Sequence, residues 1–258
     1  MIVEPVRAFA DNYIWMILND ARSQCAIVDP GDAGPVTQWL EREGVEPVAL
    51  LITHHHGDHV GGIRGLLSSF PNLEVYGPAS ERIPGITRRL EEDDVVTLDA
   101  LGVEFRVLDV PGHTAGHIAY LGEGALFCGD TLFAGGCGRV FDGTFQQLCA
   151  SLKKIRDLPG DTLVYCAHEY TLDNLGFAKW VEPSNPDLLA RDDQDMALQE
   201  SGMPTVPSRL SLEKATNPFL RFDIPAVIQR AEEQAGRPLA DACSVFTVLR
   251  QWKDSEYD

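Results

Sequence analysis

The sequence predicts an α/β protein with a helical C-terminal part. Over roughly the first 170 residues, short apolar runs of strand type alternate with turn residues and with a few amphipathic helical stretches. Several of these runs end directly in histidine or aspartate, the clearest being the run that leads into His54. After His168 the strand pattern disappears and amphipathic helical patterns replace it.

The N-terminal part yields strands and helices in order along the chain. Turn-forming residues end several runs, for example at 29–32 and at 111–112, where proline and glycine interrupt the pattern. We expect helices at 34–43, 63–70 and 145–158 and a mixed loop region at 78–94. The expected strands are 13–18, 25–28, 48–53, 73–76, 95–98, 103–110, 117–121, 125–128 and 163–167.

The C-terminal part is punctuated by prolines and predicts helices at 171–181, 187–199, 224–235 and 240–256. This change of pattern places a domain boundary near residue 172. We therefore expect a catalytic domain at 1–172 and a helical domain at 173–258, with no internal repeat.

Composition indicates a soluble protein. The chain of 258 residues has 44% hydrophobic and 23% charged residues, and it shows neither a long apolar run nor a signal-peptide pattern. We expect a cytoplasmic protein. The formal net charge of −18 disfavours broad binding to nucleic acid or to an anionic membrane, so an anionic substrate would require a local cationic pocket.

The six cysteines are scattered and include no C-x-x-C pair, and most lie in apolar runs. We interpret them as reduced, mostly buried thiols. Cys137 differs because it lies in a glycine-rich loop, where a small residue in a tight turn is a better interpretation than a catalytic thiol.

The densest set of chemical groups follows the strand expected at 48–53. Alternate side chains of an extended segment share a face, so His54 and His56 point together while His55 points the other way. Asp58 and His59 follow after Gly57, where the chain leaves the strand. The simpler alternatives are a surface histidine run or core histidines satisfied by hydrogen bonds, but strand-end ligands at one sheet edge are typical of hydrolytic metal sites.

Three more donors, His113, Asp130 and His168, stand at other strand ends. The resulting five histidines and two aspartates exceed the needs of one tetrahedral ion, so we predict two metal ions. One ion would be held by His54, His56 and His113, the other by Asp58, His59 and His168, with Asp130 as the bridge. These nitrogen and oxygen donors admit zinc, iron or manganese.

Asp29 and His117 are interpreted as residues that orient the ligands. A purely structural role for Asp29, capping the turn at Pro30-Gly31, is an equal alternative.

The run at 53–59 resembles the T-H-x-H-x-D-H signature of the metallo-β-lactamase superfamily, and His113, Asp130 and His168 occur in its expected order. The loop at 129–139, the segment at 168–171 and segments near 205–208, 217–221 and 249–254 are similar to glyoxalase II, the hydroxyacylglutathione hydrolase family. The resemblance implies an αββα sandwich with a C-terminal α-helical domain. It spans essentially the whole chain.

The resemblance also implies an activity and a substrate site. The family hydrolyses S-D-lactoylglutathione and other S-2-hydroxyacylglutathiones to glutathione and a 2-hydroxy acid, in the second step of methylglyoxal detoxification. A hydroxide held between two divalent ions would attack the thioester, and zinc is the first choice for these ions. Asp58 and Asp130 would take part in catalysis by way of this bridging hydroxide. A monomer is expected. The implied glutathione contacts are Arg139, Phe141, Tyr170, Arg250 and Lys253.

Two of these positions depart from the family pattern, because Arg139 stands where lysine is common and Phe141 where tyrosine often lies. Arg250 and Lys253 are three residues apart on the last expected helix and would share one face. Without the resemblance, a solvated helix end would explain them as well.

Three rival hypotheses remain. A persulfide dioxygenase of the same superfamily would use a single iron and would lack the long helical C-terminal part. A nuclease or phosphodiesterase is disfavoured by the acidic composition. A degenerate site in a metal-dependent binding module would conflict with the presence of every expected ligand.

Overall fold

The computed structural model describes residues 1–257, which form two compact units. The first unit comprises Met1–Asp109 and Gly116–Gly129, and the second comprises Val110–Ala115 and the chain from Asp130 onward. Each unit is described separately below. The domain boundary near residue 172 stays a prediction.

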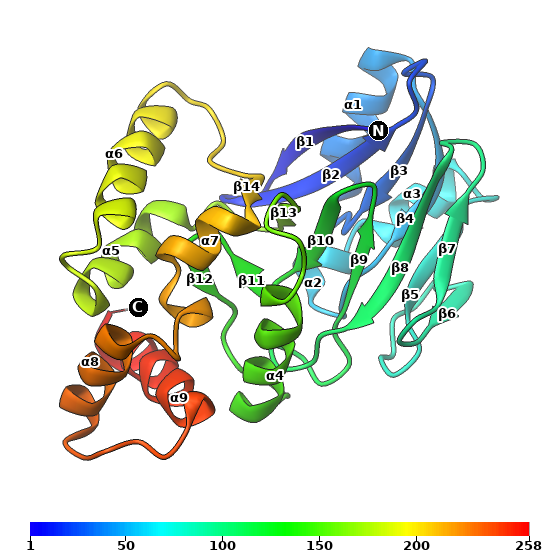
Figure 1. The fold of residues 1–258 in the computed structure, drawn as a ribbon. Helices are drawn as coiled ribbons and strands as arrows, with labels where there is room; N and C mark the ends of the chain where they lie inside the picture. The colour runs from blue at the N-terminus through cyan, green and yellow to red at the C-terminus, as the bar shows by residue number, and fades with distance from the viewer. Residues whose placement is uncertain (258) are drawn as a thin grey trace. The chain divides into compact units, whose positions relative to one another are not determined.

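The first unit contains a six-stranded sheet in the order β1-β2-β3-β4-β5-β6 (Figure 1). The first three strands are antiparallel, and the pairs from β3 to β6 are parallel. Its strands are β1 (Ile2–Ala8), β2 (Asn12–Leu18), β3 (Gln24–Val28), β4 (Glu46–Leu51), β5 (Glu74–Pro78) and β6 (Arg88–Leu90).

Helices α1 (Ala33–Glu43) and α3 (Ile63–Ser69) pack on this sheet, while the short α2 (Gly57–Val60) follows β4. Asp32 begins α1 by accepting a hydrogen bond from the backbone N–H of Gly34, and Gly44 ends it in the left-handed conformation. Apolar side chains of α1 and α3, such as Leu40 and Leu66, share one buried core with Met16 of β2.

The second sheet of the first unit is antiparallel, in the order β10-β9-β8-β7. Its strands are β7 (Val95–Leu98), β8 (Val103–Asp109), β9 (Ile118–Gly122) and β10 (Ala125–Gly129). The Tyr120 hydroxyl of β9 donates to the carbonyl oxygen of Ile52 at 2.9 Å, and the N–H of Ile118 donates to that of Thr53 at 3.0 Å. The two sheets therefore meet at the residues that follow β4.

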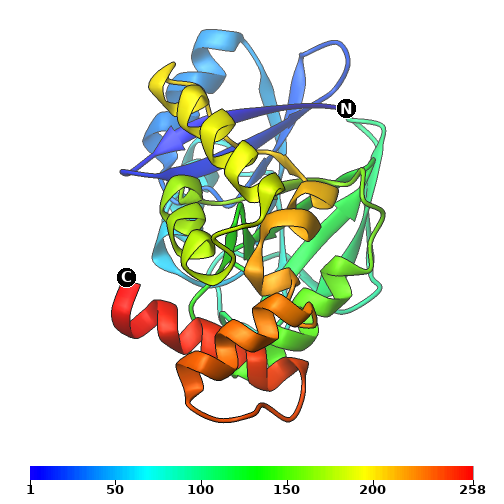
Figure 2. The same cartoon turned by 60° about the vertical axis from the view of Figure 1, so that its left-hand side comes forward.

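The second unit combines a two-stranded hairpin with a further strand pair and most of the helices (Figure 2). Its strands are β11 (Leu132–Phe133), β12 (Gly136–Cys137), β13 (Leu163–Cys166) and β14 (Ser208–Arg209). Its helices are α4 (Phe145–Arg156), α5 (Thr171–Val181), α6 (Pro186–Glu200), α7 (Leu210–Thr216), the 3-10 turn Pro218–Leu220, α8 (Pro225–Ala235), α9 (Ala242–Trp252) and the π-helical turn Lys253–Tyr257.

An aromatic core holds the C-terminal helices together. Phe177 of α5 stacks on Phe219, with ring centroids 5.8 Å apart, and meets Trp252 of α9 edge to face at 5.4 Å. Phe246 of α9 lies against Phe219 at 6.0 Å. Aromatic pairs of this kind add to the free energy gained from burying their area.

Most expected helices and strands are present, with ends that differ by one or two residues, and the last helix becomes π-helical at Lys253. Several short elements were not anticipated, among them α2, β11, β12, β14 and the 3-10 turn Pro218–Leu220, and three others have a clear reason. Strand β1 contains Pro5, which an edge strand tolerates because one side of it needs no ladder hydrogen bonds. Strand β6 lies within the region expected to be loop, and α7 is too short for a clear helical period.

The expectation that all cysteines are reduced is wrong. Cys149 of α4 and Cys243 of α9 form a disulfide, with Cα atoms 5.7 Å apart and a sequence separation of 94. Because the pairing depends on the packing of two helices that are distant in sequence, no local cysteine motif predicts it. The remaining cysteines, Cys25, Cys128, Cys137 and Cys166, are buried thiols.

Within residues 1–257, no helix combines the length and the apolar character needed to cross a membrane.

Candidate functional site

The first unit gathers its metal donors in the segment between β4 and α2. His54 is fully buried, and its ring lies 4.7 Å from that of His56 and 4.1 Å from that of His59. His59 and Asp58 lie in the single turn of α2, where Asp58 is half exposed. The sequence places these donors together because extended backbone passes directly into a helical turn.

Two glycines allow this turn to pack against the loop that follows β3. A Cβ atom at Gly61 would stand 2.5 Å from the carbonyl oxygen of Gly31, and one at Gly62 would stand 2.5 Å from that of Pro30. Only glycine permits so close an approach. The loop that carries Asp29 is thereby held against the histidine cluster.

Asp29 is a buried carboxylate with three hydrogen-bond donors around it. Its Oδ1 accepts from the backbone N–H of Thr53 at 2.8 Å, and its Oδ2 accepts from the Thr53 hydroxyl at 2.7 Å. The same Oδ2 lies 3.0 Å from Nδ1 of His59. Asp29, His54 and His59 offer atoms within 4.8 Å of one another. Asp29 therefore does more than cap a turn, since it contacts the histidine cluster directly.

These contacts determine which ring nitrogen of each histidine carries the proton. A carboxylate can only accept, so Nδ1 of His59 must donate to Asp29, which leaves the lone pair on Nε2. The Thr53 hydroxyl gives its hydrogen to Asp29 and therefore accepts from Nδ1 of His54 at 3.0 Å. Both histidines thus present an Nε2 lone pair, the form in which imidazole binds a metal.

Of the other residues around this cluster, Asp58 lies beside a ring nitrogen of His59, His117 packs against the ring of His54, and His55 points elsewhere. Nε2 of His59 lies 3.4 Å from Oδ2 of Asp58, and that oxygen also accepts from Asn12 at 2.9 Å. The buried ring of His117 stacks on His54 at 4.5 Å. His55 instead directs Nδ1 to Glu81 at 3.0 Å.

The second unit contributes His113, Asp130 and His168, all of them buried. Nε2 of His113 and Nε2 of His168 each lie 3.4 Å from Oδ2 of Asp130. Nδ1 of His113 lies 2.8 Å from the carbonyl oxygen of Arg139, which can only accept. His113 therefore also carries its lone pair on Nε2.

The spacing of these atoms suits a metal ion. Two ligand atoms on a tetrahedral zinc, each about 2.1 Å from it, stand about 3.4 Å apart. The separations from Asp58 to His59, and from Asp130 to His113 and to His168, have this value. Donor chemistry, tautomers and spacing therefore suit the binding of divalent metal ions.

Residues 131–139, here called the hairpin segment, adjoin all three donors of the second unit. The segment follows Asp130 in the chain, and a Cβ atom at Gly138 would stand 1.9 Å from the carbonyl oxygen of Asp130. The ring of Phe133 meets the ring of His168 edge to face at 5.7 Å. Together with the bond from His113 to the Arg139 carbonyl, these contacts make the hairpin segment the frame of this donor set.

Two aromatic side chains border the same donors from the solvent side. Tyr170 stacks on His168 at 4.7 Å and is 37% exposed. Phe141 lies edge to face with His113 at 5.2 Å and is 64% exposed. Their accessible rings can contact a bound organic molecule, whereas the donors behind them are shielded.

The basic residues predicted to bind glutathione differ in accessibility. The Arg139 side chain is half exposed and pairs with Asp254 at 3.5 Å. Arg250 is buried, donating to the carbonyl oxygen of Cys137 at 2.9 Å and to Asp254 at 3.0 Å. Lys253 is also buried and pairs with Asp173 at 3.2 Å. The alternative of a merely solvated helix end does not describe Arg250 or Lys253.

Cys137 is not poised as a nucleophile. The side chain is buried in β12, and burial raises the pKa of its thiol to about 11, although Arg250 acts in the opposite direction. At neutral pH the thiol is therefore protonated.

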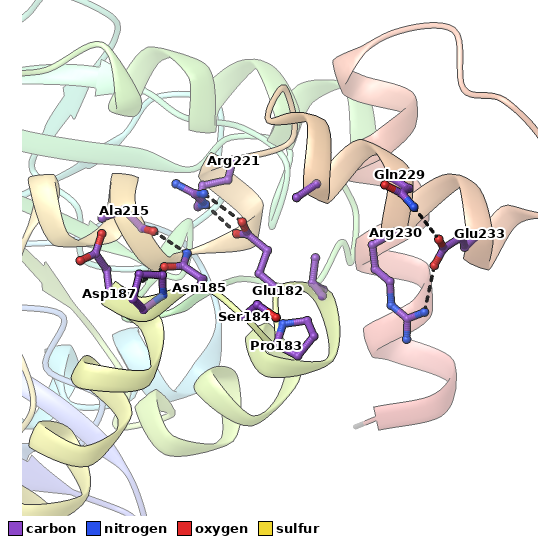
Figure 3. A pocket seen from close by; sticks show the side chains of 13 residues that line it. Glu182, Pro183, Ser184, Asn185, Asp187, Ala215, Arg221, Gln229, Arg230 and Glu233 are labelled. Carbon is purple, nitrogen blue, oxygen red and sulfur yellow. Dashed lines mark hydrogen bonds and ion pairs between the residues drawn. The ribbon is translucent and has the colours of Figure 1, made fainter.

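A cavity of about 670 Å³ in the second unit lies away from these residues (Figure 3). Its walls come from α7 and α8, from the end of α5 and from the start of α6. Glu182 forms a bidentate ion pair there with Arg221, at 2.6 and 2.9 Å. None of the predicted site residues lines it.

Sequence reasoning did not identify Thr53 as the link between Asp29 and His54, or Asn12 as a partner of Asp58. Thr53 belongs to the quoted motif, so its position was a usable signal. Asn12 carries no such signal, because it belongs to a different strand.

Comparison with known families divides the chain into two matches. Residues 11–168 match the model described as Metallo-beta-lactamase superfamily, and residues 169–256 match the one described as Hydroxyacylglutathione hydrolase C-terminus. Together they confirm the predicted fold, a metallo-β-lactamase fold followed by a C-terminal helical region.

Two curated relatives show how far the similarity extends along the chain. A Hydroxyacylglutathione hydrolase from Nitrosomonas europaea is 54% identical over 98% of this chain and 95% of its own length. Another from Alkalilimnicola ehrlichii is 55% identical over 96% of this chain and 97% of its own.

Solved structures show lower similarity. The BLEG-1 B3 metallo-beta-lactamase has a TM-score of 0.63 and 25% identity, covering 85% of this chain and 99% of its own. ETHE1 from Myxococcus xanthus has a TM-score of 0.59 and 26% identity, covering 84% and 96%. By its full-length relatives, the chain belongs to the hydroxyacylglutathione hydrolase family of the metallo-beta-lactamase superfamily.

Proposed function

We propose that the protein hydrolyses the thioester bond of S-2-hydroxyacylglutathiones, with S-D-lactoylglutathione as its principal substrate. Water adds its oxygen to the thioester carbon, the carbon–sulfur bond breaks, and the products are D-lactate and glutathione. The second step of methylglyoxal detoxification requires this reaction. Full-length similarity to relatives named Hydroxyacylglutathione hydrolase supports the assignment.

The observation that carries the proposal is the fixed tautomers of His54, His59 and His113, whose Nδ1 contacts leave each Nε2 ready to bind a metal. We assign one ion to His54, His56 and His113, the other to Asp58, His59 and His168, and the bridge to Asp130. Zinc is the proposed metal, and the same donors accept iron or manganese. When bound, such ions supply an activated water molecule and positive charge for the developing oxyanion.

The side chains around the donors have separate tasks. Asp29 and the Arg139 carbonyl hold imidazoles in their ligating form. His117 packs behind His54 and fixes its ring. Because Cys137 keeps its proton at neutral pH, no protein thiol is available there to form a covalent acyl intermediate.

We further propose that glutathione contacts Phe141 and Tyr170 through their exposed rings and Arg139 through its guanidinium. Arg250 and Lys253 retain a proposed role at this site. Their present carboxylate partners, Asp254 and Asp173, would have to share them with the carboxylates of glutathione.

A monomeric, cytoplasmic enzyme that acts on a small molecule completes the proposal. The net charge of −18 supports the expectation that it does not bind nucleic acid. The dioxygenase alternative is not carried forward, because the C-terminal helices that it would lack match the hydroxyacylglutathione hydrolase model.

The experiment offers the purified protein S-D-lactoylglutathione and, separately, glutathione persulfide with dissolved oxygen. We expect one thiol released for each thioester consumed, and no oxygen uptake. Arg139→Ala should raise KM by about tenfold, which corresponds to about 1.4 kcal/mol of lost substrate binding. Oxygen uptake without thioester hydrolysis would replace the proposal with the dioxygenase.

A further inference from the structure

The hairpin segment is held in place by side chains from the C-terminal helices. Backbone groups of its turn, where β11 passes into β12, cannot all pair within so short a hairpin. Glu213 of α7 accepts from the N–H of Gly135 at 2.9 Å, and Asn217 donates to the carbonyl oxygens of Phe133 at 3.2 Å and Gly136 at 2.9 Å. Glu213 and Asn217 are fully buried, and Phe133, Gly135 and Gly136 are buried as well.

Glu213 is the centre of this anchor. Its Oε2 accepts from Gly135 and from Asn217, the latter at 3.1 Å, while its Oε1 accepts from Arg191 and from Ser208, each at 2.6 Å. One carboxylate thus receives four hydrogen bonds in a fully buried position. The network rigidly connects α6 and α7 to the turn of the hairpin segment.

We propose that Glu213 is a positioning residue for the metal site: by fixing the hairpin segment, it holds His113, Asp130 and His168 at ligand spacing. The inference rests on the proposed function, since these residues are its assigned metal ligands. The hairpin segment touches each of them, through Gly138, the Arg139 carbonyl and Phe133. A helix of the C-terminal region therefore shapes the metal site without supplying a ligand.

Glu213→Gln tests this role because the amide has one acceptor oxygen where the carboxylate has two. The oxygen is expected to stay with Arg191, whose charge makes that bond the stronger. The amide NH₂ then faces the N–H of Gly135 and the side-chain NH₂ of Asn217, which are both donors. The hairpin segment loses its bond from Gly135 to Glu213, and Asn217 loses the acceptor that orients its amide, while the rest of the network keeps most of its bonds.

Glu182→Gln is the matched control. Glu182 is a buried carboxylate of the same unit, and its side-chain oxygens bond to Arg221 rather than to the hairpin segment (Figure 3). Both variants weaken a buried ion pair, so a general loss of stability should appear in both. Only a positioning role distinguishes them.

The measurement is zinc affinity of the metal-free proteins by chelator competition, together with the visible spectrum of the cobalt-substituted proteins. We expect Glu213→Gln to bind zinc at least tenfold more weakly and to show an altered cobalt spectrum, with Glu182→Gln unchanged in both. If Glu213→Gln does not fold, Asn174→Ala takes its place. It removes one bond to the Ala134 carbonyl, 3.1 Å long, and leaves the Arg191 pair intact.

Unchanged zinc affinity and cobalt spectrum in a folded Glu213→Gln protein would overturn the inference, as would equal changes in Glu182→Gln. Failure of the proposed function is a separate result, because it would appear as absent thioester hydrolysis in the metal-loaded unmodified protein.

Discussion

Replacing Asp29 by asparagine should change the chemistry of two proposed metal ligands, His54 and His59, through a single atom. Asparagine keeps the oxygen that accepts from the Thr53 N–H and is tolerated at the positive φ of 51° found here. Its NH₂ group takes the place of Oδ2, which in the unmodified protein accepts from the Thr53 hydroxyl and from His59. The NH₂ group can only donate, so both contacts must reverse or break.

Each reversal has a consequence for a ligand. If Nδ1 of His59 accepts from the new amide, the ring proton moves to Nε2 and blocks that nitrogen. If the Thr53 hydroxyl accepts from the amide, its hydrogen is released toward Nδ1 of His54, which drives the same change there. A supporting residue behind one ligand typically accounts for 10- to 100-fold in metal affinity, about 1.4–2.8 kcal/mol. With two ligands affected, we expect a loss of about 100-fold.

The assay measures zinc affinity by chelator competition and the protonated nitrogen of each ring by ¹⁵N NMR of the metal-free protein. Asp32→Asn is the control, because it removes the same charge from the same loop at an exposed position that caps α1. Zinc affinity within twofold of the unmodified protein, with the His54 and His59 tautomers unchanged, would refute the reasoning.

Three further predictions concern single residues. Cys137→Ala should keep activity within about twofold, because the thiol with a pKa of about 11 is protonated at neutral pH, and a trapped acyl group on Cys137 would contradict this. His55→Ala should retain both metals while His54→Ala loses metal, since His55 is directed to Glu81; metal analysis showing equal loss would show that the strand geometry is misread. Burial raises the pKa of Glu213, but Arg191 outweighs it and the net pKa lies below the ordinary 4.5. The stability advantage over Glu213→Gln should therefore be present above about pH 4.5 and vanish on acidification through the folded pKa, and unfolding measurements showing the reverse trend would exclude that charge state.

Local sequence patterns predicted much of the fold and the first cluster of potential metal donors. Apolar runs ending at turn residues predicted most of the strands, and the alternation of an extended segment predicted that His55 would point away from His54. Such features depend on residues within a few positions of one another. Short-range sequence therefore contains the information.

Long-range partnerships were the part that sequence could not supply. The disulfide between Cys149 and Cys243 depends on how two distant helices pack. The same is true of the burial of Arg250, which bonds to the Cys137 carbonyl and to Asp254. The buried carboxylate of Glu213 gave no signal either, because an isolated glutamate in a short helix is usually solvated. The family resemblance singled out Arg250, but only the structure shows that it bonds to the Cys137 carbonyl and to Asp254.

The central claim is the proposal that this chain, when it binds two divalent ions, hydrolyses an acylglutathione thioester. It is tested most directly by adding zinc stepwise to the metal-free protein and measuring, on each sample, bound metal by mass and hydrolysis of S-D-lactoylglutathione. The account predicts that activity rises until two ions are bound per chain and that Asp130→Asn lowers metal content and activity together. Full activity with one ion, no hydrolysis with two, or a fully active Asp130→Asn protein that retains both ions would contradict it.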